Sequence, residues 1–190
     1  MRCVGIDYSL RCPAVSVIGD DLTFGNSRHY YLTNTKKYVG IFNNIKGYSH
    51  KPYLTEMQRY LGIASWAVYD TELKSDDIVF LEDYSMGSTG RIFSIAENTA
   101  ILKYLLHYNS ISYITVPPTT LKKHFQGKGN ADKEKMYEAF VEKTGIALKC
   151  LFQTTAKVTN PISDICDAFA LGLYGHDYIR NSNQNSSNST

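Results

Sequence analysis

The sequence has few cysteines and no long apolar run, and each shortage excludes a class of protein. Four cysteines occur in 190 residues, none with CxxC spacing, and no histidine pair stands near them at the spacing of a zinc site. No stretch reaches the roughly 18 apolar residues that a membrane span needs, and the start, MRCVGIDYSLRC, lacks the apolar core of a signal peptide. We therefore expect a cytoplasmic protein with reduced cysteines and no membrane partner.

The chain also carries little net charge, but its charge is unevenly distributed. The formal charge is +2 at pH 7 with pI ≈ 8.2, and 43% hydrophobic with 20% charged residues is a globular composition. The segment from Lys103 to Lys135 contains six lysines and only two acidic residues. Fifteen tyrosines, which either stack on bases or fill a core, are many for this length. These features allow a polyanionic partner without proving one.

Hydrophobic periodicity divides the chain into strands followed by alternating helices and strands. Strands are predicted at 2–8, 14–18, 23–33, 78–81 and 113–116, and helices at 55–73, 92–106, 119–125, 132–141 and 162–178. Residues 34–53 and 145–160 show no clear period, and we expect loops there. The first three strands predict an antiparallel meander, so the fold class is α/β, a mixed sheet flanked by helices. We expect one domain over 1–180, then a disordered Asn/Ser tail over 181–190.

Four acidic residues stand where the sequence is otherwise apolar. Asp7 lies inside an apolar strand, although it could instead begin a turn with Ser9. Glu82 ends the run Ile-Val-Phe-Leu, although it could be a solvated strand end. Asp164 and Asp167, three residues apart, share one face of an apolar helix. Burying an ionised carboxylate without a partner costs roughly several kcal/mol, so we expect a cation beside these acids.

If these acids converge at one sheet edge, the predicted ligand is a hard divalent cation. Clustered carboxylates repel one another unless cations neutralise them. All-oxygen ligands favour Mg²⁺ or Mn²⁺ over zinc, and the D-x-D-x-D-G loop of a calcium site is absent from the sequence. Two such ions about 4 Å apart can activate water and stabilise a leaving oxygen in phosphodiester cleavage. The acids therefore predict a two-metal site with Mg²⁺, for which Mn²⁺ substitutes.

Five short motifs, taken in order, resemble the RuvC-like Holliday-junction resolvases of the RNase H-like superfamily. They are VGIDYS from Val4, VFLEDY from Val79, VPPTTLKK from Val116, GKGNADK from Gly127 and SDICDA from Ser163. Each motif alone is weak, and their order over residues 2–176 makes the resemblance specific. It implies a five-stranded mixed sheet, and a homodimer that cuts four-way and other branched DNA without a small-molecule cofactor.

The resemblance also implies roles for individual residues. Asp7, Glu82, Asp164 and Asp167 would be the metal ligands and catalytic acids, and Lys133 the catalytic lysine near the scissile phosphate. The residues expected to contact DNA are Lys122, Lys123, Lys128, Tyr84 and Arg91. A long interval between the first two acids, with an excess at 34–60, departs from the bacterial enzymes. With the Asn/Ser tail it favours a phage or viral member, acting in a bacterial cell or an infected host cell.

Three other functions fit parts of the pattern. An RNase H-like nuclease acting on structured RNA shares the early Asp, the Glu and the late Asp. A non-catalytic protein that binds branched DNA fits the basic stretch, but such a protein gains nothing from four acids opposite phosphates. An actin-like ATPase subdomain shares the meander and fails for want of a second glycine-rich phosphate loop and of length.

Overall fold

A single mixed sheet organises the molecule, and the computed structural model describes residues 2–84 and 92–187. The strands are β1 (Cys3–Asp7), β2 (Ala14–Val17), β3 (Arg28–Thr33), β4 (Gly40–Phe42), β5 (Ile45–Ser49), β6 (Ile78–Glu82) and β7 (Ser112–Val116). They lie in the order β4-β5-β3-β2-β1-β6-β7. β1, β2 and β3 form the predicted antiparallel meander, and β6 and β7 continue the sheet parallel to β1. The α/β class is confirmed.

The expectation of five strands and of a loop over 34–53 is wrong. That segment holds a 3₁₀ turn, η1 (Lys36–Tyr38), and the two strands β4 and β5, so the described sheet has seven strands. Strand β5 buries Ile45, exposes Lys46 and places Gly47 against the ring of Tyr31. Glycine and lysine are poor strand formers, and an alternation of three residues is too short to detect as a period.

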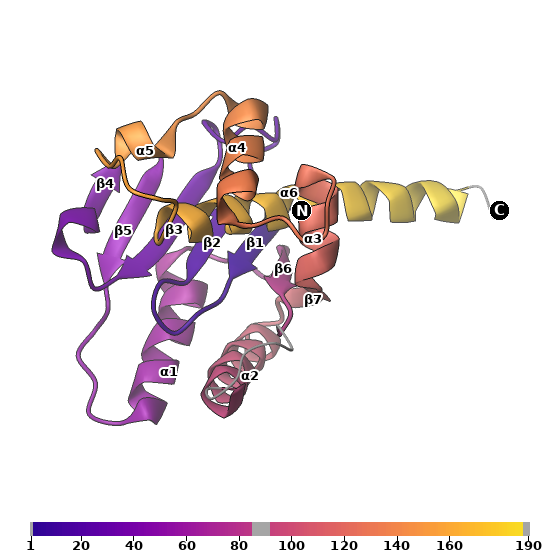
Figure 1. Cartoon of the computed structure of the whole chain (residues 1–190). Coiled ribbons are helices and arrows are strands. Elements are labelled where there is room, and N and C mark those ends of the chain that lie inside the picture. Colours follow the sequence, from indigo (N-terminus) through magenta and orange to yellow (C-terminus); the bar gives the residue numbers. More distant parts are fainter. Residues whose placement is uncertain (1, 85–91, 188–190) are drawn as a thin grey trace.

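Helices cover both faces of this sheet (Figure 1). One face packs against α1 (Glu56–Ser65), the π-helical turn η2 (Trp66–Asp70) and α2 (Ile92–Tyr108). The other packs against α3 (Pro118–Gln126), α4 (Lys133–Thr144), α5 (Leu148–Leu151) and α6 (Ile162–Ser187). α1 begins as predicted, because Thr55 and Gln58 form a reciprocal capping box. α4 begins with Asp132, whose side chain accepts from the Lys135 backbone N–H.

Helix α6 lies unusually close to the centre of the sheet because glycines remove the side chains between them. A Cβ atom at Gly5 of β1 would stand 1.9 Å from the Ala168 carbonyl oxygen of α6. A Cβ at Gly172 would stand 2.4 Å from Ile18, and one at Gly175 would stand 2.2 Å from the Phe80 ring. Backbone contact between α6 and β1 brings the acids of both elements to the same place.

The last helix is longer than predicted. α6 continues to Ser187 instead of ending at 178, so residues 181–187 of the expected tail are part of this helix. The cause is cooperativity, since a helix that is already nucleated by packing extends at little cost even through polar residues. The helix projects beyond the sheet (Figure 1). No helix within 2–84 and 92–187 is long and apolar enough to cross a membrane.

Candidate active site

The four predicted acids meet at one edge of the sheet. β1 and β6 are parallel neighbours with Ile6 opposite Leu81, so Asp7 and Glu82 leave the same edge side by side. The first turns of α6 bring Asp164 and Asp167 onto that edge. The Asp7 side chain interacts with those of Glu82 and Asp164, so carboxyl groups from two strands and one helix lie close together. The structure thus joins residues that are up to 160 positions apart.

Burial raises the pKa of all four acids, and repulsion by neighbouring carboxylates adds to the rise for Asp7 and Asp167. Loss of hydration raises the pKa of Asp7 well above its usual range, and the charges of its three acidic neighbours raise it further. The same causes raise the pKa of Asp167 to about 8. Burial raises the pKa of Asp164 to about 6, although Lys133 opposes that rise, and it also raises the pKa of Glu82. The cluster therefore holds protons at neutral pH unless a cation replaces them.

Two of the predicted lysines lie within electrostatic reach of these acids. The positive charge of Lys133 lowers the pKa of each of the four carboxyls. Its Nζ donates to Ser163 Oγ at 3.2 Å, and that hydroxyl lies 3.5 Å from Asp164 Oδ2. Lys122, on α3, lowers the pKa of Glu82 and of Asp167. The chain therefore supplies positive charge from two helices beside its acidic cluster.

The other residues expected to contact DNA lie away from the four acids or outside the residues that the structure describes. Lys123 and Lys128 are exposed around the end of α3 and are not among the charges that shift the pKa values of the acids. Tyr84 is 38% exposed, and Lys103 Nζ lies 5.2 Å from its ring centroid. Arg91 and the Gly87–Gly90 loop lie outside the described residues. The structure thus groups Tyr84 with Lys103, a member of the basic stretch 103–135.

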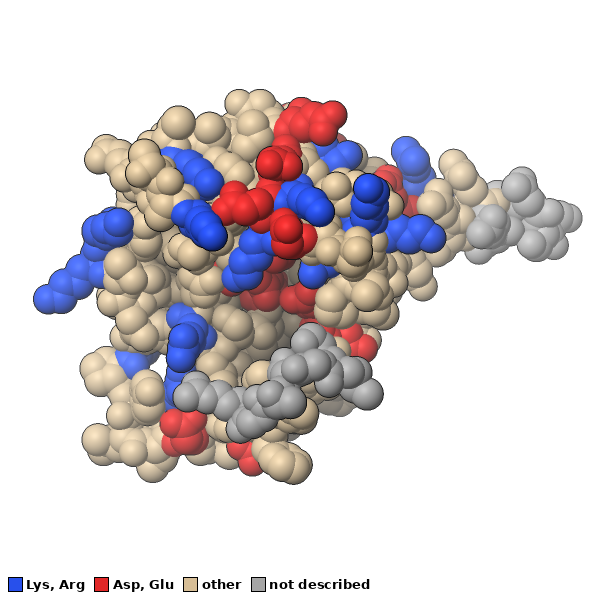
Figure 2. Space-filling view, in the orientation of Figure 1, with Lys and Arg blue, Asp and Glu red and all other residues tan. Residues whose placement is uncertain are grey.

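An open pocket adjoins the acids. Asp164 and Lys133 line it together with the 8–11 segment that follows β1. Figure 2 shows acidic side chains set among lysine and arginine side chains on the face that carries α3 and α4. A negatively charged centre with a positively charged surround suits a substrate that is a polyanion and needs cations at its reacting phosphate.

The donor chemistry fits a divalent metal, while the side chains do not form a finished coordination shell. Across the described ranges, no three Asp, Glu, His or Cys side chains are arranged to hold a metal ion. The available donors are nevertheless four carboxylates, which are the ligands that Mg²⁺ and Mn²⁺ select. Burial and nearby carboxylates raise the pKa of Asp7, and a bound cation would offset both causes. The residues fit such an ion in type, and binding requires small side-chain rotations.

Sequence reasoning missed three residues that touch the acidic cluster. Ser163 and Asn160 both accept from Lys133 Nζ, the latter at 3.5 Å, and so orient this side chain. Cys12, expected to act as a small hydrophobe, is buried, and its thiol is close enough to Asp164 to affect the pKa of that carboxyl. Ser163 directly precedes Asp164 in the chain, which is a signal that could have identified it. Asn160 lies just before α6 and four residues before Asp164, but its residue type gives no signal, and Cys12 is brought here by the tertiary fold alone.

Comparison with known proteins identifies the fold. No protein-family model and no curated protein matches the chain. Thermus thermophilus RuvC is similar with 13% identity and a TM-score of 0.57, over 96% of this chain and 97% of that one. The same protein in complex with a Holliday-junction substrate gives 15% identity and 0.61, over 96% of both chains. Fowlpox virus resolvase in complex with Holliday-junction DNA gives 14% and 0.53, over 94% and 99%. The chain therefore has the fold of the RuvC-like resolvases, as its motifs predict.

Proposed function

We propose that this protein is a metal-dependent endonuclease that cleaves four-way DNA junctions. The observation that carries the proposal is the convergence of Asp7, Glu82, Asp164 and Asp167 at one sheet edge, with Lys133 and Lys122 beside them. Such a concentration of buried negative charge destabilises the protein and has no use in a simple binder. The likeness to RuvC and to the fowlpox resolvase, both solved with Holliday-junction DNA, supports the choice of substrate.

The proposed cofactor is a pair of Mg²⁺ ions held by the four acids. When bound, the ions supply charge for the attacking and leaving oxygens of a phosphodiester. The chain's own contribution is to fix the ligands, because the close contact between Gly5 and Ala168 holds α6 against β1. Partial burial of the carboxylates strengthens their attraction to a cation, since less water competes for them.

Lys133 is the proposed contact to the scissile phosphate. Its Nζ is held by Ser163 and Asn160 and keeps a free donor position, because an ammonium group has three protons. An ammonium in this place stabilises negative charge that develops on phosphate oxygens in the transition state. Lys122, Lys123 and Lys128 are proposed to bind the DNA backbone, as a part of the basic stretch 103–135. Tyr84 and Arg91 are proposed to contact the branch.

We further propose that two copies act together through α2. This helix is apolar on most of its surface, and only one side faces the core through Leu102 and Leu106. Its other side exposes Phe93 at 85%, Tyr108 at 71% and Tyr104 at 59%. Aromatic side chains that are this exposed on one helix are typical of an interface. A two-fold dimer gives two equivalent sites for the two cuts that a junction needs.

A comparison of cleavage on four substrates tests the proposed function. The labelled substrates are a four-way DNA junction, a DNA flap, a linear duplex and a structured RNA hairpin, each incubated with the protein and Mg²⁺. We expect symmetric cuts near the branch of the junction, and none in the linear duplex. Cleavage of the RNA alone would instead identify a ribonuclease. Binding of the junction without any cut would identify a protein that only binds branched DNA.

A further inference from the structure

A second pocket lies on the other side of the 8–11 segment from the acids. It has a volume of about 500 Å³, including the space at its open mouth, and lies between β5, the 50–55 segment, α1 and η2. Three aromatic side chains line it, those of Tyr48, Tyr53 and Trp66. A pocket lined by aromatic rings suits a small planar group.

Two buried hydrogen-bond donors of this pocket have no acceptor in the described part of the chain. One is the indole Nε1 of Trp66, a residue that is only 3% exposed, and the other is Nε of Arg59. A buried donor without an acceptor costs about 1–3 kcal/mol. Both residues line the same pocket, and a ligand that reached these two nitrogens would supply the acceptors that they lack.

The guanidinium of Arg59 is fixed in place by its other contacts. Its Nη2 donates to the Leu10 carbonyl oxygen at 2.9 Å, and its Nη1 lies 3.6 Å from the Glu56 carboxylate. Its central carbon lies 5.3 Å from the Tyr53 ring centroid. Nε is thus a buried donor without an acceptor on a side chain whose other two nitrogens have partners. The pocket presents this donor without a further loss of side-chain entropy.

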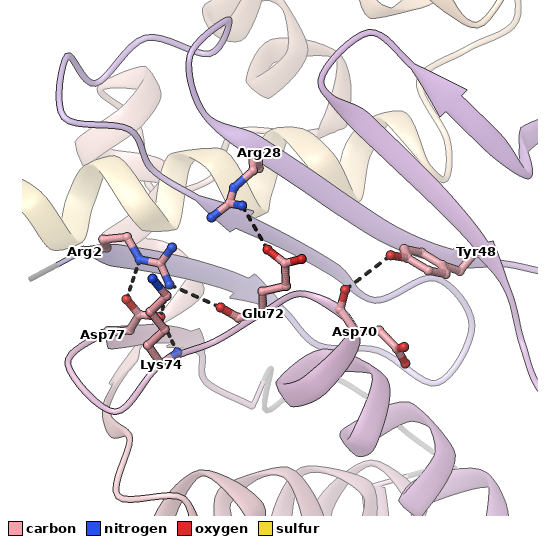
Figure 3. A network of polar contacts seen from close by, with 7 residues as sticks. All are labelled: Arg2, Arg28, Tyr48, Asp70, Glu72, Lys74 and Asp77. Atoms are coloured by element: carbon pink, nitrogen blue, oxygen red, sulfur yellow. Dashed lines mark hydrogen bonds and ion pairs between the residues drawn. The ribbon is translucent and has the colours of Figure 1, made fainter.

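The wall opposite is also held in place. The Tyr48 hydroxyl donates to the Asp70 carbonyl oxygen, at the edge of the polar network that links Arg2, Glu72 and Asp77 (Figure 3). The Tyr48 and Trp66 rings meet edge to face with centroids 6.2 Å apart. An aromatic wall that is held by the Tyr48 hydrogen bond and by the contact between the two rings is largely preformed for a ligand.

The position of the pocket points to DNA as the source of that ligand. Arg59 bonds the carbonyl of Leu10, and His50 donates through Nε2 to the carbonyl of Arg11 at 2.8 Å. Leu10 and Arg11 also line the pocket beside the acids, so one short segment separates the two pockets. Within 34–60 the sequence has five basic residues and one acidic residue, and such a segment attracts phosphates.

We propose that this pocket binds one unpaired base of the DNA strand near the branch. Stacking on the aromatic wall would supply most of the affinity. Trp66 Nε1 and Arg59 Nε would donate to carbonyl oxygens of the base, which favours thymine or guanine over adenine. Lys51, at the mouth, would bind the adjoining phosphate. The inference rests on the proposed function for its substrate, and it assigns a role to the segment that departs from the bacterial enzymes.

The emission of Trp66 reports directly on the pocket, because the chain has no other tryptophan. The protein is titrated in EDTA with oligothymidylate, with oligodeoxyadenylate, with a paired duplex and with a four-way junction that carries one unpaired thymine at the branch. We expect oligothymidylate and this junction to quench the emission, the adenylate to bind less tightly and the duplex to leave the emission unchanged. Unchanged emission at saturating oligothymidylate, with binding verified by anisotropy, would overturn the proposal.

Variants separate stacking and hydrogen bonding. Tyr53→Leu removes an aromatic side chain that is 44% exposed, and Tyr178→Leu is its matched control, because Tyr178 is 43% exposed on α6. We expect Tyr53→Leu to weaken the binding of oligothymidylate by about 5- to 100-fold and Tyr178→Leu to leave it unchanged. Trp66→Phe keeps a ring and loses the donor, and should weaken binding by about 3- to 10-fold in anisotropy. Equal affinities for all three variants would refute the pocket.

Failure of this inference differs from failure of the proposed function. If junctions are cut while Trp66 does not respond to any unpaired base, the nuclease stands and the base pocket is wrong. If Trp66 responds to oligothymidylate while no DNA is cut with Mg²⁺, the pocket stands as a single-strand site and the nuclease is wrong.

Discussion

Replacing Gly5 by alanine tests whether the contact between α6 and β1 builds the site. The new Cβ would stand 1.9 Å from the Ala168 oxygen and 2.4 Å from the Gly172 nitrogen, and both of these are backbone atoms that no rotamer change can move. Real Cβ atoms keep at least 3.0 Å from such atoms. The helix must therefore withdraw by about 1 Å, a displacement that can cost about 100-fold in rate at an active site.

The expected loss of stability follows from the same geometry. Overpacking a core costs about 1–3 kcal/mol, and we place Gly5→Ala at the upper end because backbone opposes backbone. For a chain of this size, 3 kcal/mol corresponds to a fall in Tm of roughly 6–12 °C. Gly172→Ala should cost less, because its Cβ meets the Ile18 side chain, which can move.

Gly62→Ala is the matched control. Gly62 lies inside α1, and a Cβ there would meet no atom within 4 Å. Alanine has the higher helix propensity, so this variant should gain about 0.5–1 kcal/mol. The assay is urea unfolding of the three variants, followed by junction cleavage of those that fold. Wild-type stability and activity of Gly5→Ala would refute the argument that this glycine sets the distance between the two elements.

Three further predictions concern charge. In EDTA, Asp167→Asn should be more stable than wild type by a margin that grows from pH 4 to pH 8. The folded state raises the pKa of Asp167 to about 8, so folded wild type holds a proton that the unfolded chain releases, and its stability falls as the pH rises. A margin that stays constant with pH in urea unfolding would contradict this. Burial lowers the pKa of His29 to about 4, so wild type should lose stability relative to His29→Gln as the pH falls below about 6.5, and parallel unfolding curves would speak against it. Lys133→Ala should slow junction cleavage by about 100-fold or more with little loss of binding. Lys123→Ala, which removes a proposed backbone contact, should instead weaken junction binding and leave the cleavage rate at saturating junction unchanged; equal cleavage rates for Lys133→Ala and wild type would contradict the role of Lys133.

The sequence predicts those parts of the fold whose pattern is local. The buried run Ile78–Leu81, the cap at Thr55 and the cap at Asp132 are local signals, and the structure confirms the elements they predict. β4 and β5 were missed because a short edge hairpin needs little hydrophobic surface. The end of α6 was missed because helix propagation depends on the packing of the preceding turns, which the tail's own composition does not show.

The candidate site shows the same limit. The acids are visible in the sequence because charge inside an apolar run is unusual. Their convergence is visible only through the resemblance to a known family, and the structure shows it through the alignment of β1, β6 and α6. The contact of Asn160 with Lys133 and the approach of Cys12 to Asp164 join different elements and depend on tertiary packing. The base pocket was hidden for a similar reason, because it gathers Tyr48, Arg59 and Trp66 from three elements.

The most direct test of the account is the nicking of one labelled four-way DNA junction under three conditions. These are wild type with Mg²⁺, wild type with EDTA, and Asp7→Asn with Mg²⁺. The account predicts paired cuts near the branch in the first condition alone, with Asp7→Asn still binding the junction. Equal cutting in EDTA or by Asp7→Asn would contradict the assignment of the acidic cluster as a metal-dependent active site.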